Sequence, residues 1–320
     1  MRLKAGRQTR FCQASYCRYG QIPAQIRLKC HGMSEMDKLK KKIIIISVIV
    51  LCAVIFAALA FDVRLKTVQY TVRSDKVGDT VRIVLITDLH SCKYGDNQQT
   101  LTDAINEQEP DILLFGGDIC DDKLPHDNEE ILLNAVAGKY PCYYVTGNHE
   151  YWSGEADKIT EMFRSYGVTV LEGTYEIAEI NGQRLKICGI DDPAAEKYAK
   201  GSSGIYSQLE ALKSARDDDY FTILLSHRPE YIETYLQYGF DLVLSGHAHG
   251  GQWRIPGILN GLLSPDQGWF PKYAGGKYTF DHCEMIVSRG LARESTRVPR
   301  IFNRPELVVV EIAANNDETG

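Results

Sequence analysis

Two histidines that lie two residues apart, His247 and His249, directly follow a short apolar run at residues 241–245. An apolar run of about four to eight residues that ends at a turn residue such as Gly246 is typical of a buried strand. Side chains at positions i and i+2 of an extended segment point the same way, so both imidazoles can face one space. The pair alone is weak evidence, because surface and core histidines are common.

Four earlier apolar runs, at residues 81–87, 111–115, 141–146 and 221–225, end in the same manner. The residues that follow them are Asp88 and His90, Asp118, Asn148 and His149, and His227. Each has an ordinary structural explanation when taken singly, such as a turn, a helix cap or a structural histidine. Open α/β sheets place their sites beyond the carboxyl ends of their strands. Five strands that end alike therefore favour one shared site over five separate structural roles.

Imidazole, carboxylate and carboxamide groups together suit divalent metals such as Mn²⁺, Fe or Zn²⁺ better than Ca²⁺ or a closed cysteine site. A ligand set of this size, with one carboxylate able to bridge, predicts a binuclear centre with metals roughly 3.5–4 Å apart. The residues alone therefore predict a centre for two divalent metal ions.

The elements that must position these residues alternate between strands and helices. Helices are predicted at residues 97–108, 129–137, 155–166, 205–215 and 230–238, and further strands at 67–72, 168–171, 175–180, 184–190, 284–288 and 307–312. Asn181-Gly182 predicts a two-residue hairpin turn. Strands and helices that alternate along the chain, followed by two further strands at its end, predict a layered α/β sheet domain.

Residues 43–61 form an apolar stretch without charge, preceded by a lysine cluster that ends at Lys42. As a helix it spans about 28 Å, the thickness of a hydrocarbon core. The positive-inside rule predicts a cytoplasmic N-terminus and an extracytoplasmic domain at the cell membrane. A buried soluble helix and a cleavable signal peptide, suggested by Ala58-Leu-Ala60, are the alternatives. The length of the apolar core favours a retained single-pass anchor.

Charge divides the chain at the same place. Residues 1–42 hold eleven Lys/Arg and two acidic residues, and the remainder is acidic, which argues against a nucleic-acid partner. The basic segment 1–42 is expected to be disordered, and for its first 32 residues the alternative is absence from the natural product, since Met33 would be an ordinary start. The predicted organisation is completed by a linker with first strand pieces at 62–80, the catalytic domain at 81–312 and a polar tail at 313–320.

Taken in order, the motifs resemble the signature of the calcineurin-like metallophosphoesterases. They are Asp88-Leu-His90, Gly117-Asp118 with Asp121, Gly147-Asn-His-Glu150, His227 and Gly246-His-Ala-His249. The resemblance covers residues 81–312. Residues 250–256, Gly-Gly-Gln-Trp-Arg-Ile-Pro, are similar to the bacterial membrane-associated branch related to UDP-2,3-diacylglucosamine pyrophosphohydrolases.

This resemblance implies a four-layer α/β/β/α metallophosphoesterase sandwich, here preceded by a single N-terminal transmembrane helix. It assigns ligands to two metals bridged by Asp118: Asp88, His90 and His249 for one, and Asn148, His227 and His247 for the other. His149 would be the catalytic residue, which stabilises the reacting phosphoryl group and protonates the leaving oxygen. Many relatives carry Asp where this chain has Glu150, which leaves its help in orienting His149 open. Attack in line, without a phosphoenzyme, is expected.

The function predicted is membrane-anchored hydrolysis of a phosphodiester or pyrophosphate bond by metal-activated hydroxide. One alternative is another metallohydrolase class, although an amidohydrolase barrel usually carries its His-x-His on the first strand. The other is a non-catalytic phosphate-binding module, which should have lost ligands. Aromatic residues between His249 and Asp281, with Arg254, Lys272 and Lys277, predict an amphiphilic substrate that is lipid-linked or sugar-nucleotide-linked. The alternative is that these aromatics simply cover the core.

Overall fold

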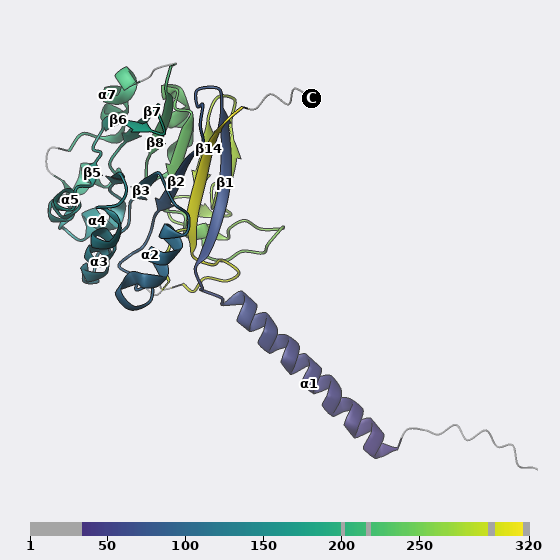
Figure 1. The fold of residues 1–320 in the computed structure, drawn as a ribbon. Helices are drawn as coiled ribbons and strands as arrows, with labels where there is room; N and C mark the ends of the chain where they lie inside the picture. Colours follow the sequence, from purple (N-terminus) through teal and green to yellow (C-terminus); the bar gives the residue numbers. More distant parts are fainter. Residues whose placement is uncertain (1–33, 200–201, 216–218, 294–297, 316–320) are drawn as a thin grey trace, which may run out of the picture. The chain divides into compact units, whose positions relative to one another are not determined.

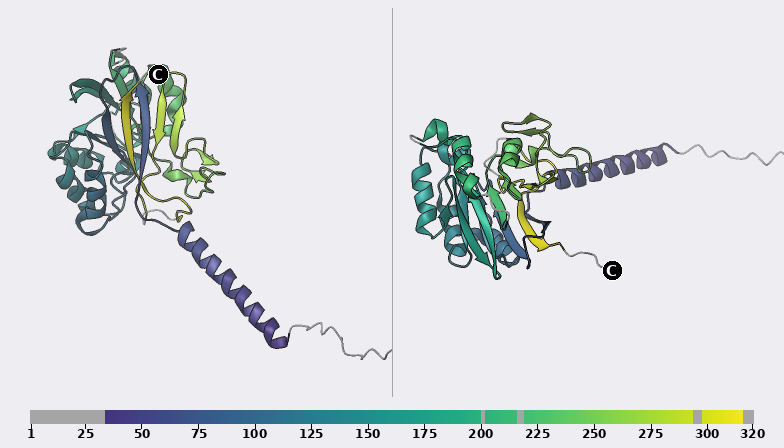
Figure 2. Two further views of the ribbon diagram at one scale, coloured as in Figure 1. Left: turned by 45° about the vertical axis from the view of Figure 1, so that its right-hand side comes forward. Right: turned by 90° about the horizontal axis from the view of Figure 1, so that it is seen from above.

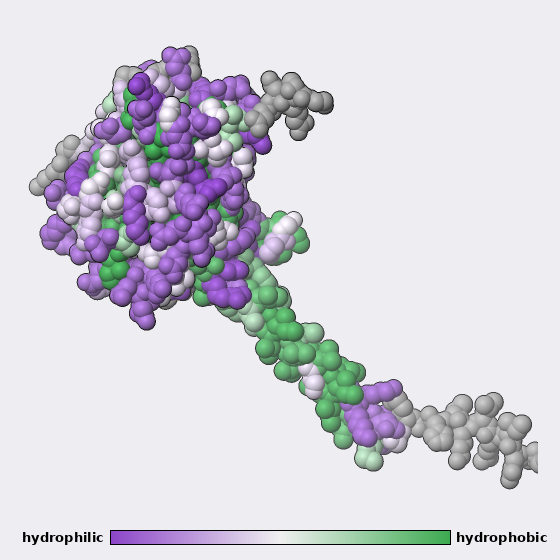
Figure 3. Space-filling view, in the orientation of Figure 1, coloured by the Kyte–Doolittle hydropathy of each residue, from purple (hydrophilic) through white to green (hydrophobic). Residues whose placement is uncertain are grey.

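The computed structural model describes residues 34–199, 202–215, 219–293 and 298–315. Residues 1–33 of the segment expected to be disordered lie outside these residues, and residues 35–42 of it are helical, which corrects that expectation. Helix α1 (Glu35–Ala60) is 26 residues long and is exposed along nearly its whole length. Its length and composition are those of a membrane span. Figure 3 shows an apolar band along the visible face of this helix, with hydrophilic residues gathered at the lysine end.

Sheet A has six strands in the order β1-β14-β2-β3-β4-β5. Their bounds are β1 (Lys66–Ser74), β14 (Glu306–Ala314), β2 (Val81–Ile86), β3 (Ile112–Gly116), β4 (Cys142–Val145) and β5 (Thr169–Val170). Neighbours run parallel except β14 and β2. β1 pairs with β14 along all nine residues, so the predicted linker at 62–80 contains the edge strand of this sheet (Figures 1 and 2).

Sheet B also has six strands, in the order β12-β13-β9-β8-β7-β6. Their bounds are β12 (Gly276–Thr279), β13 (Glu284–Val287), β9 (Leu242–Ser245), β8 (Phe221–Leu225), β7 (Gln183–Gly189) and β6 (Thr174–Ile180). The four central strands are parallel and the two edge strands are antiparallel. The predicted Asn181-Gly182 turn joins β6 to β7, with both residues at positive φ as a type I′ turn requires.

Alternate residues of each strand explain the layers. In β2, Ile83 and Leu85 enter a core shared by both sheets, whereas Val84 and Ile86 enter a core between sheet A and its helices. Helices α2 (Gln99–Asn106), α3 (Asp127–Val136) and α5 (Ala156–Ser165) cover sheet A, and α7 (Ile205–Ala211) and α8 (Ile232–Tyr235) cover sheet B. The predicted four-layer sandwich is therefore confirmed.

The remaining elements are short. They are η1 (Asp96–Gln98), α4 (Asn148–Trp152), α6 (Ala195–Tyr198), η2 (Leu212–Ala215), η3 (Pro229–Tyr231), η4 (Leu236–Tyr238), η5 (His249–Gly251), β10 (Leu263–Ser264) and β11 (Gly268–Trp269). The helix predicted at 230–238 is thus three short pieces, η3, α8 and η4. Residues 250–281, called the aromatic segment below, contain the end of η5, the β10–β11 hairpin and the edge strand β12.

Candidate metal centre

The carboxyl ends of five strands, β2, β3 and β4 of sheet A and β8 and β9 of sheet B, deliver the predicted site residues. We call this region, with the seven predicted ligands, the ligand edge. All seven are nearly inaccessible to solvent: Asp88, His90, Asp118, Asn148, His227, His247 and His249. His149, in the first turn of α4, is only partly buried. The structure therefore brings together the residues that five separate motifs supplied.

Five of these residues occupy left-handed backbone, which side-chain-bearing residues rarely adopt. The positive φ values are 50° at Asp88, 47° at His90, 51° at Asp118, 66° at His247 and 45° at His249. Such strain persists where the surrounding structure fixes it, and it concentrates at functional sites. Two glycines permit the close approach: a Cβ at Gly147 would lie 2.3 Å from Asp118 Oδ1, and one at Gly246 would lie 2.5 Å from Asp88 Oδ2.

The donor atoms form two groups, each within a span of 4.8 Å, and Asp118 belongs to both. The first group contains Asp88, His90, Asp118 and His249, and the second contains Asp118, His227 and His247. Asp118 Oδ2 lies 3.6 Å from His90 Nε2 and 3.1 Å from His227 Nε2. One carboxylate oxygen thus faces both sets of imidazoles, as a bridging ligand must.

Several buried donor atoms of this cluster have no hydrogen-bond partner among the described residues. They are Asp88 Oδ2, His90 Nε2, Asn148 Oδ1 and His249 Nδ1. A buried polar group without a partner costs free energy, so such atoms gather where an ion or ligand completes them. Carboxylate, amide and imidazole donors fit Mn²⁺, Fe or Zn²⁺. The residues present therefore fit divalent metal ions.

Backbone groups hold the donors in position. His227 Nδ1 lies 2.8 Å from the carbonyl oxygen of Gly116, so this nitrogen donates there and Nε2 is left to face Asp118. The carboxylate of Asp88 accepts the backbone N–H of His247 at 2.9 Å. That of Asp118 accepts the N–H of His149 at 2.8 Å. The bonds of His227 and Asp88 link the two sheets, and the bond of Asp118 joins two loops of sheet A.

Glu150 holds the two ligand loops of sheet A together and does not orient His149. Its carboxylate accepts four backbone N–H groups at 2.8–3.1 Å, those of Asp118, Ile119, Cys120 and Gly147. The partner of His149 is Asp122, whose Oδ1 lies 2.8 Å from His149 Nδ1. Sequence reasoning missed Asp122, although it directly follows Asp121 of the motif. Burial lowers the pKa of His149 below its usual range.

Two further residues that the motifs did not reveal contact the second donor group. Arg228 Nη1 and Asp266 Oδ2 each lie 2.9 Å from His247 Nε2, and Arg228 also pairs with Asp192 at 3.0 Å. Asp266 lies between β10 and β11, so the aromatic segment reaches back to the ligand edge. No local pattern marks Asp266, because it is 19 residues from the histidine that it contacts.

The side chains of the aromatic segment divide into two sets. Tyr273, Tyr278 and Phe280 pack on the core under sheet B, as the covering role predicts. Trp253, Trp269 and Phe270 are exposed, the last two with 67% of their surface accessible. Trp253 and Trp269 line an apolar cavity of about 230 Å³ with Gly251, two residues after His249.

The three cations named for this segment do not gather at the ligand edge. Lys272 lies 3.4 Å from Glu233, and Lys277 lies 2.9 Å from Glu284. Arg254 lines a separate pocket. Among the described residues, the cation that contacts a ligand residue is Arg228 instead.

Comparison with known proteins agrees with this geometry. Residues 81–251 match the family described as calcineurin-like phosphoesterase. The uncharacterized metallophosphoesterase YkuE of Bacillus subtilis is 29% identical over 79% of this chain and 87% of that protein. An uncharacterized metallophosphoesterase of Aquifex aeolicus is 32% identical over 78% of this chain and 92% of that protein. A Danio rerio transmembrane protein with a metallophosphoesterase domain is 27% identical over 62% of this chain and 48% of that protein.

Proposed function

The chain belongs to the calcineurin-like phosphoesterase family, and we propose that it is a membrane-anchored hydrolase of phosphodiester or pyrophosphate bonds with two divalent metal ions. The observation that carries the proposal is the pair of donor groups that share Asp118. In this assignment Asp88, His90 and His249 hold one ion. Asn148, His227 and His247 hold the other.

When bound, two divalent ions would neutralise phosphate oxygens and supply a nucleophile from water at neutral pH. The protein's part is to hold the donors at fixed positions: Glu150 clamps the loops of Asp118 and Asn148, and Gly116 fixes the tautomer of His227. Preorganised groups need no rearrangement as charge develops, which is the main source of electrostatic catalysis. The acidic body of the protein does not oppose phosphate binding, since the positive charge is local.

His149 is proposed as the residue that serves the leaving group. Its Nδ1–H donates to Asp122, which leaves Nε2 for the substrate. Its ring packs edge-on against that of His90, with ring centroids 4.3 Å apart. This position beside a ligand, with partial exposure, suits transfer of a proton to a departing oxygen.

The substrate proposed is amphiphilic, such as a lipid-linked or sugar-nucleotide diphosphate of the UDP-2,3-diacylglucosamine type. The apolar cavity beside Gly251 supports this, because it begins at the chain segment that carries His249. Helix α1 supports it as well, since an anchor keeps the domain beside membrane lipids. The lysine cluster before the apolar stretch supports the proposed orientation, in which the domain is extracytoplasmic.

The deciding experiment uses the full chain purified in neutral detergent and loaded with Mn²⁺, Fe²⁺ or Zn²⁺ in turn. Bound metal is counted by elemental analysis, and hydrolysis is measured on small phosphodiesters, sugar-nucleotide diphosphates and their acylated forms. We expect about two ions per chain, loss of activity with a chelator, and highest kcat/KM on an acylated substrate. An active metal-free protein, or a metal-loaded chain inactive on the whole panel, would contradict the proposal.

A further inference from the structure

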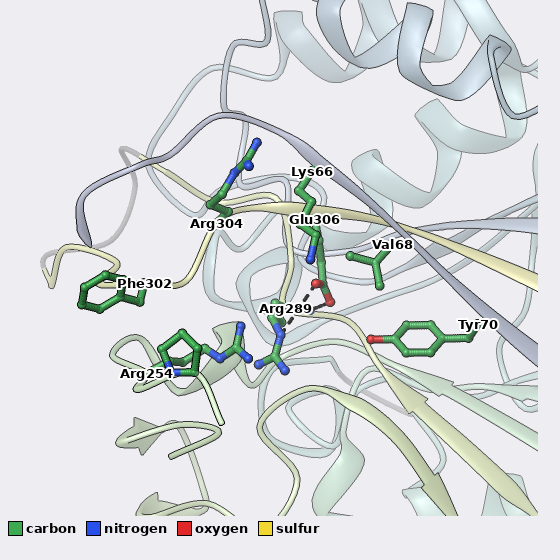
Figure 4. Close-up of a pocket in the computed structure, with 9 residues that line it drawn as sticks. Lys66, Val68, Tyr70, Arg254, Arg289, Phe302, Arg304 and Glu306 are labelled. Carbon is green, nitrogen blue, oxygen red and sulfur yellow. Dashed lines mark hydrogen bonds and ion pairs between the residues drawn. The ribbon is translucent and has the colours of Figure 1, made fainter. Parts of the chain in front are cut away.

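A second pocket, which shares no residue with the ligand edge, lies beside the start of β1 (Figure 4). Its volume is about 390 Å³, within the range of roughly 300–1,000 Å³ that is usual for small-molecule sites. Four cations line it: Lys66, Arg254, Arg289 and Arg304. They come from β1, the aromatic segment and the loop between β13 and β14, so the fold gathers them from distant parts of the chain.

The cations of this pocket outnumber its carboxylates. Glu306 is the acidic residue that lines it, and its carboxylate lies 3.7 Å from Arg289 Nε. The same carboxylate accepts the backbone N–H of Arg289 at 3.0 Å. Burial raises the pKa of Glu306, although the neighbouring arginines oppose this shift. The pocket therefore has an excess of positive charge.

Among the three arginines of this pocket, Arg254 is the one whose guanidinium has a buried nitrogen without a hydrogen-bond partner in the described part of the chain. Two of the other guanidinium groups bond to fixed oxygens: Arg289 Nη2 to Asn260 Oδ1 at 2.7 Å, and Arg304 Nε to the carbonyl oxygen of Arg64 at 2.9 Å. Arg254 Nε is buried and has no hydrogen-bond partner among the described residues. Its guanidinium lies close to that of Arg289 in Figure 4. A half-buried cation beside a like charge is costly unless an anion offsets it.

The walls of the pocket also contain apolar groups, and one of them contacts the end of helix α1. Phe302 donates its backbone N–H to the carbonyl oxygen of Ala60 at 2.7 Å. Its ring lies 5.3 Å from that of Phe56, centroid to centroid. Lys66 follows the last residue of the helix after only five residues. Because so few residues separate the helix from Lys66, a membrane anchor formed by α1 would keep this lysine near lipid headgroups.

We propose that this pocket binds the phosphate group of an anionic membrane lipid, without hydrolysing it. Arg254 and Lys66 donate hydrogen bonds to the phosphate oxygens, and Val68 and Phe302 contact the glycerol and the first acyl carbons. Arginine suits this role because its planar donors match two phosphate oxygens at once. Bound lipid thus offsets the charge of Arg254 and fixes the domain against the membrane surface.

The test uses the full chain in micelles of an uncharged sugar detergent, titrated with phosphatidylglycerol, phosphatidylcholine or inorganic phosphate. Bound molecules are counted by native mass spectrometry. We expect one phosphatidylglycerol per chain at concentrations where phosphatidylcholine does not bind. Arg254→Gln should weaken this binding by about tenfold, the usual effect of losing one charge-assisted hydrogen bond. Lys66→Gln, at an exposed position where folding is not at risk, should weaken it in the same direction.

The matched control is Lys139→Gln, an exposed lysine between α3 and β4 that lies outside the pocket and should leave lipid binding unchanged. Unchanged melting temperature and metal content show that each variant is folded. Equal binding of the two lipids, or phosphatidylglycerol binding that survives in both pocket variants, overturns the proposal. Displacement of the lipid by an equal concentration of inorganic phosphate also overturns it, because the pocket would then be a site for free phosphate.

Discussion

At the ligand edge each donor follows a buried strand, and the seven predicted ligands are almost fully inaccessible to solvent. The aromatic segment, which leaves this edge at Gly250, has two-residue strands and exposes Trp253, Trp269 and Phe270. Helices and strands hold reacting groups to within fractions of an ångström. Loops vary in sequence and conformation, and they often determine which ligand binds. We therefore expect substitutions at the ligand edge to affect bond cleavage, and substitutions in the aromatic segment to affect substrate choice.

The contact between Asp266 and His247 joins the two regions. It allows the segment to influence the edge, so the division of labour is open to measurement. Substitutions in each region should affect different quantities: metal content and kcat at the edge, and the ratio between substrates in the segment.

The largest effect is expected from Asp118→Asn at the edge. This change removes the negative charge that both donor groups share. Metal affinity should fall by more than the 10–100-fold usual for residues behind the ligands, and activity should fall to background. Elemental analysis and hydrolysis of a small phosphodiester measure the two losses. Retention of both ions would show that the two donor groups are independent.

A change at His149 should separate proton transfer from metal binding. His149→Ala should keep the bound ions and lose kcat by roughly 10²–10⁴-fold, the scale of general acid catalysis. Asp122→Asn, which keeps the shape of the partner of Nδ1, should lose less kcat than His149→Ala. Metal content is the internal control. Loss of metal from His149→Ala equal to that from Asp118→Asn would mean that His149 is a ligand.

The ligand edge was readable from the sequence because each donor is encoded next to its own strand. Asp88-Leu-His90 and Gly246-His-Ala-His249 are local patterns, and parallel strands bring their ends together without further information. The contacts that complete the edge are not local: Arg228 meets Asp192 across 36 residues, and Asp266 meets His247 across a loop of irregular backbone. The pairing of β1 with β14, at opposite ends of the domain, was hidden for the same reason.

Trimming the exposed aromatics tests the selective role of the segment. In the double variant Trp269→Ala with Phe270→Ala, turnover of an acylated substrate should fall about tenfold or more, since two large apolar contacts are lost. Turnover of a small chromogenic phosphodiester should stay near that of the wild type. Ile258→Ala, at another exposed apolar position in the same segment, is the control. Equal losses on both substrates would give the segment a structural role only.

Asp266→Asn tests whether the aromatic segment also affects metal affinity at the ligand edge. The substitution keeps a hydrogen-bond acceptor near His247 Nε2 and removes the charge. Metal affinity should fall by about tenfold, the lower end of the effect of residues that orient a ligand. Isothermal titration of the chelator-treated full chain measures this affinity. Unchanged affinity would make the aromatic segment independent of the metal centre.

The last prediction concerns the stability of the fold rather than activity, at Glu129 in the first turn of α3. Burial raises the pKa of Glu129 to about 7, so the native state holds this proton over a range in which the unfolded chain has released it. The contribution of Glu129 to stability is therefore greatest below about pH 4.5 and falls as the pH rises to about 7. Glu129→Gln removes this loss, so at pH 8 the variant should be more stable than the wild type by up to about 3 kcal/mol. Melting curves of the detergent-solubilised chain at pH 5 and pH 8, with chelator throughout, measure the difference, and Glu107→Gln at an exposed position is the control. A variant less stable than the wild type at pH 8 would mean that the Glu129 carboxylate is stabilised by partners that outweigh its burial.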